Sequence, residues 1–392
     1  MQAIILAAGK GTRFSPFSET KPKPLFSLFG KSILEHNLDE LQGLVDEAII
    51  VVGHKKEMIM EKIGERYGSI KITYVEDAKI EGTASAARLA MPFLKERFLL
   101  LNGDDFYCRE DMKKAIAKFP SVTVKEHQNP SSFGVVEEEN GIVKNMVEKP
   151  VNPTSNLVNT ALFCWPKEIL DYKIEKSERG EYETTELLRQ FIKEKKMNVC
   201  KASFWVPASC PWDIFDAVPY LFLKQKKARK GKIEKGAVLK GDVIVGEETV
   251  IKSGSYIEGP VYIGKDCVIG PNCFLRSGTV IEDGCRVGQA VEIKNSLIGK
   301  GTFASHLAYI GDSIIGENCN FGAGTITANF RHDAGSIRTM VKGELVDTKR
   351  VKFGTVIGDN VKTGIHTIIY PGRKIWPNKT TLPGEKVEKD IN

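Results

Sequence analysis

The sequence predicts an α/β fold followed by a parallel β-helix, and three observations carry this prediction. Up to about residue 220, short apolar runs of strand type alternate with segments of helical period. From Ile233 onward, a large aliphatic residue recurs every six positions. A length of 392 residues also exceeds one ordinary core and favours two domains. We expect the first domain over residues 1–225, a basic linker over 226–232 and the β-helix over 233–392.

The first part is expected to form a mostly parallel sheet covered by helices on both faces. Strand-type runs occupy residues 3–6, 48–52, 72–75 and 98–101, with helical spacing at residues 33–41 and 58–63. Alternation of strand and helix is typical of parallel sheets. Because ligands of such sheets bind beyond the carboxyl ends of the strands, the loops after these runs are the first places to look for a site.

A glycine-containing loop follows the first strand and reads AAGKGTRFSP over residues 7–16. Gly-x-Gly at a strand end lets backbone amides approach an anion. Lys10, Arg13, Lys21 and Lys23 supply positive charge for phosphates. Phe14 stands where the dinucleotide fingerprint needs its third glycine, and the Walker spacing is absent. The loop therefore predicts a phosphate site of a third kind.

Acidic residues follow another strand of the same predicted sheet, in the run NGDD over residues 102–105. An acidic residue beside a phosphate loop is typical of a Mg²⁺ site. Asp104 is the first candidate ligand and Asp213 the second. Either aspartate alone is more typical of a turn or a helix cap, but their combination with the phosphate loop favours the metal.

Six short motifs then occur in a fixed order: GxGTRxxP at residues 9–16, KPKPL at 21–25, EGTA at 81–84, GD at 103–104, EKP at 148–150 and WD at 212–213. This ordered set resembles the sugar-1-phosphate nucleotidyltransferases over the whole first domain. The resemblance implies a Rossmann-like domain in which a sugar phosphate attacks the α-phosphate of a nucleoside triphosphate and releases pyrophosphate. The attacking oxygen is already anionic, so catalysis is positioning and charge neutralisation.

The same resemblance implies roles for individual residues. It assigns catalysis to Arg13, Lys23, Asp104 and Asp213, with Mg²⁺ on the two aspartates. The nucleotide would be bound by Leu6, Ala7, Ala8, Gly9, Gly11, Thr12, Arg13, Lys23, Asp77, Gly82 and Thr83. The sugar phosphate would be bound by Gly134, Glu148, Lys149 and Asn159.

Two departures from the family pattern concern specificity. Uridylyl and thymidylyl enzymes commonly carry a glutamine where this chain has Asp77. A carboxylate only accepts hydrogen bonds, so it could pair with the donor edge of guanine, and the preferred base stays open. The Asn-x-Gly common in the sugar pocket reads Asn159-Thr160-Ala161 here, which could alter the sugar contacts.

The second domain is predicted from its repeat. Four residues after each large aliphatic residue comes a smaller one, and two inward positions in every six predict stacked β-helix coils. Cys267, Cys273 and Cys285 fall on the small positions, which indicates core filling. The period slips near Asn295 and again before Ile315, and a loop over residues 329–352 interrupts it. Such slips and loops are good places to look for a site.

This repeat resembles the acetyltransferase half of the bifunctional glucosamine-1-phosphate acetyltransferase and N-acetylglucosamine-1-phosphate uridylyltransferase family. The matching stretches are FLR at residues 274–276, VEIK at 291–294, SHL at 305–307 and NFGAGTITAN at 320–329. The resemblance implies a left-handed β-helix, usually homotrimeric, in which His306 takes the proton of the attacking sugar amine. The amino-sugar phosphate would be bound by Arg276, Lys294, Tyr309 and Asn320, and acetyl-CoA by Ala323 and Asn329. Beyond Asn329 the match fades, and a family lysine is replaced by Gly354.

Together these observations predict a bifunctional enzyme. It would acetylate glucosamine-1-phosphate, or a related amino-sugar 1-phosphate, and transfer a nucleotidyl group from UTP or dTTP to give a nucleotide sugar of the UDP-N-acetylglucosamine type. One alternative is a monofunctional nucleotidyltransferase, GTP-using in one version, with a structural or regulatory β-helix. Another is a non-catalytic regulatory or exchange-factor subunit of the same architecture.

Bulk composition narrows the partners. The net charge of +6 is small for this length, and the basic run near residues 224–232 has no interleaved aromatic residues, so we expect no nucleic acid. No stretch approaches the roughly 20 apolar residues of a membrane helix, so we expect no membrane association. Eight cysteines without a Cys-x-x-Cys pair are typical of a reducing cytoplasm.

Overall fold

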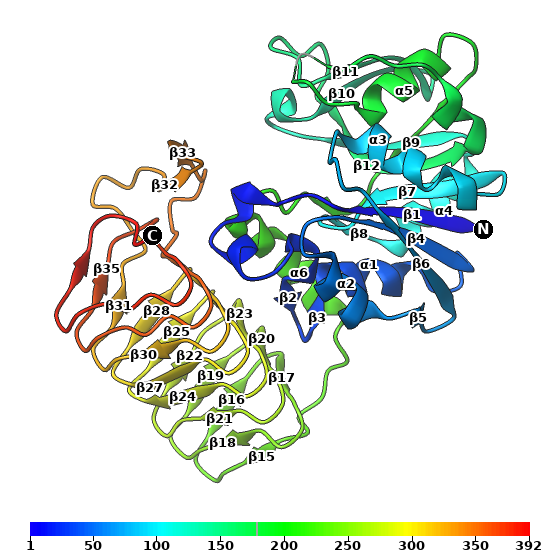
Figure 1. Ribbon diagram of the computed structural model, residues 1–392. Helices are drawn as coiled ribbons and strands as arrows, with labels where there is room; N and C mark the ends of the chain where they lie inside the picture. Colours follow the sequence, from blue (N-terminus) through cyan, green and yellow to red (C-terminus); the bar gives the residue numbers. More distant parts are fainter. Residues whose placement is uncertain (178) are drawn as a thin grey trace. The chain divides into compact units, whose positions relative to one another are not determined.

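The computed structural model describes residues 1–177 and 179–392 (Figure 1). Its contacts divide the chain into two units. The first unit comprises Met1–Lys10, Pro22–Leu25 and Ile33–Pro207, and the second comprises Gly11–Lys21, Phe26–Ser32 and Ala208–Asn392. The contact boundary therefore differs from the predicted boundary at residue 225, because two short N-terminal segments and the last helix before the repeat pack with the β-helix.

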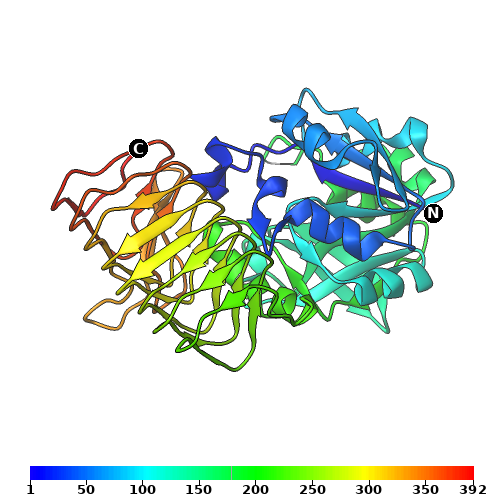
Figure 2. The same cartoon turned by 90° about the horizontal axis from the view of Figure 1, so that it is seen from below.

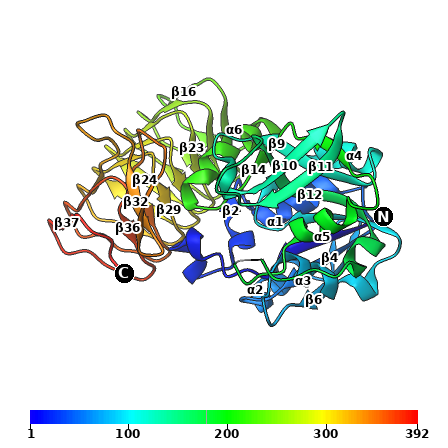
Figure 3. The same cartoon turned by 90° about the horizontal axis from the view of Figure 1, so that it is seen from above.

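A ten-stranded mixed sheet forms the centre of the first unit. Its strands are β1 (Gln2–Ala7), β4 (Glu47–Val52), β5 (Arg66–Tyr67), β6 (Ile70–Glu76), β7 (Arg97–Asn102), β9 (Ser121–Glu126), β10 (Gly134–Glu139), β11 (Ile142–Glu148), β12 (Leu157–Pro166) and β13 (Asn198–Lys201). The order is β10-β11-β13-β9-β12-β7-β1-β4-β6-β5. Strands β7, β1, β4 and β6 are parallel, as predicted, and β9 to β12 form the antiparallel part seen from above in Figure 3.

Helices cover both faces of this sheet because alternate residues of β1 pack into different cores. Ile4 packs in one apolar cluster with Ala84 and Leu187, whereas Ile5 packs in another with Leu38 and Ile59. The helices that supply these residues are α1 (Ile33–Leu41), α2 (Lys56–Ile63), α3 (Thr83–Leu89) and α5 (Thr184–Phe191). The same unit also contains α4 (Arg109–Ala117). Two short strands, β8 (Phe106–Tyr107) and β14 (Trp205–Val206), pair separately.

The second unit is built on a left-handed parallel β-helix with three sheets (Figure 2). The first sheet contains β15 (Lys232–Ile233), β18 (Val250–Ile251), β21 (Val268–Ile269), β24 (Arg286–Gln289), β27 (Phe303–His306) and β30 (Asn320–Phe321). The second contains β16 (Val238–Lys240), β19 (Tyr256–Glu258), β22 (Phe274–Leu275), β25 (Glu292–Lys294), β28 (Tyr309–Gly311), β31 (Ile326–Thr327), β35 (Ile368–Ile369) and β37 (Lys386–Val387). The third contains β17 (Val243–Val245), β20 (Val261–Ile263), β23 (Thr279–Ile281), β26 (Leu297–Ile298), β29 (Ile314–Ile315), β34 (Val356–Ile357) and β36 (Lys374–Ile375).

The predicted slips are coils that are one residue shorter than the others. Ordinary coils return to the same sheet after 18 residues, as where Lys232 pairs with Val250. Val280 instead pairs with Leu297, 17 residues on, and Leu297 pairs with Ile314, again 17 residues on. The shortened corners contain Asn295 (φ 42°) and Asp312 (φ 48°). The stacking register is kept, so the slip changes only the corner.

The structure confirms the burial of three cysteines and the loop that interrupts the repeat. Cys267, Cys273 and Cys285 are buried in its core. The expected loop contains the hairpin β32 (Arg338–Val341) and β33 (Glu344–Asp347), after which β34 pairs directly with β29. The predicted linker is attached to the first coils by ion pairs of Lys227 with Asp242 and of Lys230 with Glu247.

Elements from before the repeat also belong to the second unit. They are η1 (Thr12–Phe14), η2 (Phe17–Glu19), the hairpin β2 (Ser27–Leu28) and β3 (Lys31–Ser32), η7 (Pro211–Asp213) and α6 (Ile214–Lys224). The tip of the β2–β3 hairpin has positive φ at both Phe29 and Gly30. The Phe29 ring lies 5.1 Å from the ring of Tyr262 on β20, and this packing holds the strained residue in place.

Candidate functional sites

The phosphate loop leaves β1 with its backbone exposed. Gly9 and Lys10 are exposed, as are Thr12 and Arg13. Gly11 adopts the left-handed conformation (φ 61°), and the Phe14 amide donates to its carbonyl at 2.8 Å. Phe14 itself is fully buried, with its ring 5.2 Å from that of Phe26. The residue that breaks the dinucleotide fingerprint therefore anchors the loop, while Gly9, Lys10, Thr12 and Arg13 around it are exposed.

Lys23 and Asp104 form an ion pair in which the lysine is buried and the aspartate side chain is 34% exposed. Lys23 lies in η3 (Lys23–Leu25), is 6 % exposed, and donates from Nζ to Asp104 Oδ2 at 2.7 Å. Asp104 follows β7, which pairs in parallel with β1 through Leu6 and Asn102, so it lies at the predicted edge. Burying an ammonium is costly unless it is paired. The pair therefore fixes a cation and a carboxylate at the ligand-binding edge before any substrate arrives.

Asp105 completes this edge, although its position in the sequence does not distinguish it from Asp104. Trp205 Nε1 and Asn102 Nδ2 both donate to Asp105 Oδ2 at 3.3 Å. Burial, reinforced by the charge of Asp104, raises the pKa of this carboxyl group well above its usual range. Asp105 thus holds the loop that presents Asp104.

Asp77 is buried and supports its own turn. Its Oδ1 accepts the Ile80 amide at 2.8 Å and the Lys79 amide at 3.2 Å. One oxygen of this carboxylate therefore already serves the backbone, and a role in reading the base remains a prediction. Beyond it, Gly82 has φ 123°, and a Cβ there would lie 2.5 Å from the Tyr182 carbonyl oxygen, so only glycine fits. Thr83 then begins α3.

Three of the four predicted sugar-phosphate residues come together on β10 and β11. Gly134 pairs directly with Glu148, and a Cβ on Gly134 would lie 3.1 Å from Glu148 Oε2. Lys149 Nζ lies 3.4 Å from Glu148 Oε1. Two residues that sequence reasoning missed join them: Arg179 Nη1 lies 3.7 Å from Glu148 Oε1 and 3.1 Å from Glu183 Oε1. Burial, with the charge of Glu148, raises the pKa of Glu183.

Asn159 lies on the neighbouring strand β12, which pairs with β10. Its Oδ1 accepts the Ala161 amide at 2.8 Å, and Ala161 has φ 57°. A glycine takes this conformation without strain. The structure thus gives a physical reason for the family's Asn-x-Gly pattern, and this chain follows the same backbone with alanine.

Asp213 belongs to the second unit, whereas Asp104 belongs to the first. It ends η7, and its Oδ2 accepts the Cys210 amide at 2.7 Å. Within residues 1–177 and 179–392, no group of three or more His, Cys, Asp or Glu side chains gathers as a metal site. Mg²⁺ typically takes one or two carboxylates and completes its shell with water and phosphate oxygens. Each of the two aspartates offers a carboxylate of that kind, and their shared role in binding Mg²⁺ remains a prediction.

In the β-helix, Lys294, Tyr309 and Asn329 gather around Asp312, which sequence reasoning missed. Asp312 is buried, and its Oδ2 accepts Asn329 Nδ2 at 2.5 Å and lies 3.4 Å from Lys294 Nζ. Its Oδ1 accepts Asn295 Nδ2 at 2.8 Å, and Asn329 Nδ2 also donates to the Tyr309 hydroxyl at 3.1 Å. The position of Asp312 at a shortened corner was the available signal.

His306 lies at the preceding corner of the coil. It ends β27 in the first sheet and is exposed, whereas Lys294 ends β25 in the second sheet. The Gly324 amide donates to the Leu307 carbonyl at 3.0 Å, so the segment containing Ala323 lies one coil beyond His306. Asn320, exposed at the start of β30, pairs with Phe303 of β27.

Arg276 follows β22, two coils before β28. Its Nη1 lies 2.9 Å from Glu292 Oε1, and its guanidinium is 5.6 Å from the centre of the Phe274 ring. The hydrogen bond to Glu292 raises the pKa of Arg276. Glu292 pairs with Tyr309 in the sheet. The predicted residues thus lie on strands of the first and second sheets and at the corners beside them.

A phosphate loop at the edge of a parallel sheet, followed by a three-sided β-helix with an exposed histidine, defines the class of sugar-phosphate nucleotidyltransferases that carry a β-helix. Comparison with known proteins agrees. Residues 2–209 match the nucleotidyl transferase family model, and residues 257–383 match the GMPPB C-terminal domain model.

The relatives extend over the whole chain. "Bifunctional protein GlmU" of Methanocaldococcus jannaschii is 42% identical over 396 residues, covering 100% of this chain and 96% of that protein. "Bifunctional sugar-1-phosphate nucleotidylyltransferase/acetyltransferase" of Sulfurisphaera tokodaii is 38% identical over 409 residues, covering 100% and 98%. The chain belongs to this family of bifunctional sugar-1-phosphate nucleotidylyltransferase/acetyltransferases.

One solved structure supports the fold of the first part. A putative glucose-1-phosphate thymidylyltransferase from Bacillus anthracis superposes with a TM-score of 0.52 at 22% identity, over 58% of this chain and 98% of that chain. Among the helices of the described ranges, none is both long and apolar enough to span a membrane.

Proposed function

We propose that this chain acetylates an amino-sugar 1-phosphate with acetyl-CoA and couples a sugar 1-phosphate to a nucleotide, giving a nucleotide sugar and pyrophosphate. The observation that carries this proposal is that one chain, similar over its full length to bifunctional relatives, holds two separate sets of polar residues. One set surrounds the Lys23–Asp104 pair, and the other surrounds His306 and Asp312.

For nucleotidyl transfer, we assign binding of the leaving pyrophosphate to the loop amides and Arg13. Lys23 neutralises phosphate charge, and Glu148 and Lys149 bind the sugar phosphate. The sugar-phosphate oxygen forms a bond to the α-phosphorus as the bond to pyrophosphate breaks, and no proton has to be removed. Asp104 and Asp213 are the proposed Mg²⁺ ligands. The metal would add positive charge on the triphosphate oxygens.

For acetyl transfer, we assign the role of general base to His306. The sugar amine attacks the thioester carbonyl, His306 takes the amine proton, and the carbon–sulfur bond breaks to release CoA, which takes up a proton. His306 is exposed, and an imidazole suits the role of proton acceptor near neutral pH. Lys294 and Arg276 provide cations for the sugar phosphate, with Tyr309 and Asn320 beside them and Ala323 and Asn329 lining the acetyl-CoA side.

The finer details of the proposal concern specificity and assembly. The preferred triphosphate is UTP or dTTP. Asp77 is the residue that would determine whether GTP is accepted. The protein is a cytoplasmic homotrimer assembled through the β-helix, and glucosamine-1-phosphate is the first amino-sugar substrate to test. A curated relative of the first part, "UTP--glucose-1-phosphate uridylyltransferase AglF" of Haloferax volcanii, is 35% identical over 205 residues, which supports the uridine choice.

The experiment incubates the protein with glucosamine- or galactosamine-1-phosphate, acetyl-CoA, Mg²⁺ and each nucleoside triphosphate singly, and identifies products by mass. We expect an acetylated sugar phosphate in every reaction and a nucleotide sugar with UTP or dTTP. His306→Ala should lower acetyl transfer by about 10²–10⁴-fold and leave nucleotidyl transfer from pre-acetylated substrate within about twofold. Full acetyl transfer by that variant would refute the assigned role, and no product from the wild type would favour a regulatory subunit.

A further inference from the structure

The segment between two of the predicted catalytic cations is held by the β-helix at both ends. Arg13 and Lys23 flank this segment, and residues 11–21 of it belong to the second unit. Two residues after Arg13, the Ser15 carbonyl accepts a hydrogen bond from Lys374 Nζ at 3.2 Å. Two residues before Lys23, Lys21 Nζ pairs with Glu317 Oε1 at 2.5 Å and Asp359 Oδ2 at 3.3 Å.

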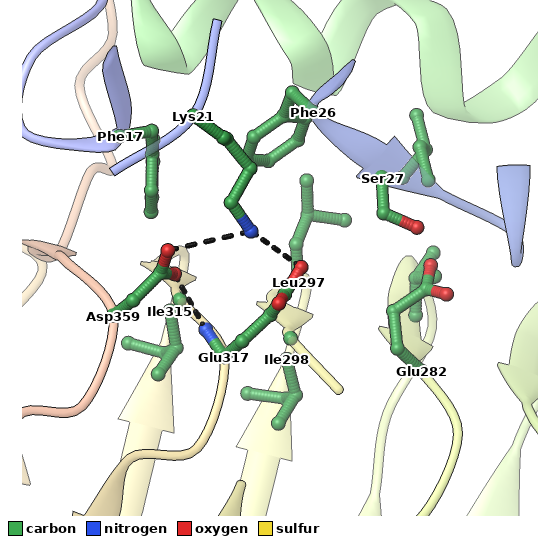
Figure 4. Close-up of a pocket in the computed structure, with 14 residues that line it drawn as sticks. Phe17, Lys21, Phe26, Ser27, Glu282, Leu297, Ile298, Ile315, Glu317 and Asp359 are labelled. Atoms are coloured by element: carbon green, nitrogen blue, oxygen red, sulfur yellow. Dashed lines mark hydrogen bonds and ion pairs between the residues drawn. The ribbon is translucent and has the colours of Figure 1, made fainter. Parts of the chain in front are cut away.

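The second attachment is a closed polar cluster, shown in Figure 4. Asp359 Oδ2 also accepts the Thr20 hydroxyl at 2.6 Å, and its Oδ1 accepts the Glu317 amide at 2.8 Å. The Lys21 side chain is only 13% exposed and that of Asp359 only 7%. The sequence analysis predicted that Lys21 is one of the phosphate-binding cations. In the structure its ammonium group instead forms ion pairs with two carboxylates of the β-helix.

The first attachment is a buried lysine that also reaches the predicted metal-ligand segment. Lys374, at the start of β36, is 1% exposed. Its ammonium lies 5.7 Å from the centre of the Trp212 ring, directly before Asp213, and the same ring lies 5.8 Å from that of Phe353. Burying an ammonium group costs free energy. A lysine at this position is therefore not expected if the side chain only fills space.

We propose that Lys374, Glu317 and Asp359 are positioning residues for nucleotidyl transfer, through which the β-helix fixes two segments of its own unit, the one that carries Arg13 and the one that carries Asp213. This inference rests on the proposed nucleotidyl transfer. A shift of about 1 Å in groups that bind the reacting phosphates can cost on the order of 100-fold in rate. The β-helix would then serve both reactions. It would bind the substrates of acetyl transfer directly, and it would support nucleotidyl transfer without contacting the substrates of that reaction.

The test is a set of full-length variants: Lys374→Met, Lys21→Met, and Glu317→Gln with Asp359→Asn. We expect each to lower kcat for nucleotidyl transfer about tenfold or more with a smaller change in the KM of the sugar phosphate. Acetyl transfer should stay within about twofold. The control is Glu247→Gln, which breaks an exposed cluster with Lys230 and Lys265 on the early coils and should leave both activities unchanged.

A double-mutant cycle tests whether the two sides act together. Lys21→Met combined with the Glu317 and Asp359 changes should lower kcat little more than either alone, since both remove the same attachment. The inference is overturned if the effects on kcat multiply, or if Lys21→Met lowers kcat while the Glu317 and Asp359 changes do not, because Lys21 would then act on the phosphate directly. It is also overturned if kcat stays within twofold of wild type in every variant, or if acetyl transfer falls as much as nucleotidyl transfer.

Hydrogen exchange provides a readout that does not depend on turnover. The amides of Glu19, Thr20 and Lys21 are hydrogen-bonded within the segment, and the variants should increase their exchange at least about tenfold relative to wild type and Glu247→Gln. Unchanged exchange would overturn the inference even if the wild type formed no nucleotide sugar. That last outcome alone would count against the proposed function instead.

Discussion

The two candidate sites bring their polar groups together by different means. At the nucleotidyl site, the contact of Lys23 with Asp104 joins residues 81 positions apart, and that of Trp205 with Asp105 joins residues 100 positions apart. At the acetyl site, Asn295, Asp312 and Asn329 occupy the same corner of three successive coils, 17 residues apart. A solenoid aligns side chains by repetition, whereas the sheet edge needs a specific long-range fold. The difference teaches that the first site should be the more sensitive to single substitutions.

The largest effect is expected for Lys23→Met. Removing a fixed positive charge from a phosphate-transfer site typically costs about 10²–10³-fold in kcat, and Asp104 would also lose its partner. Nucleotidyl transfer should fall by that factor, while acetyl transfer measured by CoA release should be unchanged. Equal loss of both activities would mean that the two sites are not independent and would break the comparison.

The next effect is on stability in the β-helix unit. Burial, with the nearby charges of Asp283 and Glu317, raises the pKa of Glu282 to about 7, against the lowering effect of the Gly30 amide that donates to its Oε2 at 2.8 Å. The folded state therefore binds more protons than the unfolded state between about pH 4.5 and 7, and stability falls as the pH rises through this window.

Glu282→Gln removes this titration. Relative to wild type, the variant should gain up to about 3 kcal/mol at pH 8, and the gain should disappear near pH 4.5. Thermal unfolding at pH 4.5, 6 and 8 measures it, with Glu247→Gln as a surface control. A wild type whose stability does not change with pH relative to Glu282→Gln would contradict the raised pKa.

A smaller effect is expected for Asp312→Asn at the acetyl site. The amide keeps the shape but removes the carboxylate that accepts from Asn295 and Asn329 and faces Lys294. Losing a buried charge-assisted hydrogen bond costs roughly 1.5–3 kcal/mol, so kcat/KM for the amino-sugar phosphate should fall about 10–100-fold. Nucleotidyl transfer from pre-acetylated substrate is the internal control, and an unchanged kcat/KM would show that repetition alone maintains the site.

The smallest effect is expected for Ala161→Gly. Ala161 has φ 57° beside Asn159, and relief of this strain is worth about 1 kcal/mol, offset by the greater freedom of glycine in the unfolded chain. We expect a change in unfolding free energy within about 1 kcal/mol and a KM for the sugar phosphate within about threefold. A larger change in KM would show that the family's glycine serves the sugar rather than the backbone.

Much of both folds could be predicted because the signals are local. The spacing of hydrophobic residues predicts the strands at residues 3–6 and 98–101, the six-residue repeat and the shortened coils near Asn295. The predicted sheet edge and the burial of Cys267, Cys273 and Cys285 follow from the same spacing. Arg179 and Glu183 were missed because nothing in their local sequence distinguishes them from surface charges, whereas for Asp312 the shortened repeat was the signal.

The sequence by itself determined the two folds, the family and the order of the predicted site residues, since periodicity and short motifs act within one turn, strand or coil. Only the tertiary structure decided that Asp105 accepts a hydrogen bond from Trp205, 100 residues away, and that Lys21 pairs with Glu317, 296 residues away in the chain. The physical reason is that a charged side chain takes its role from the groups that desolvate and pair with it. In this chain those groups come from distant coils and loops.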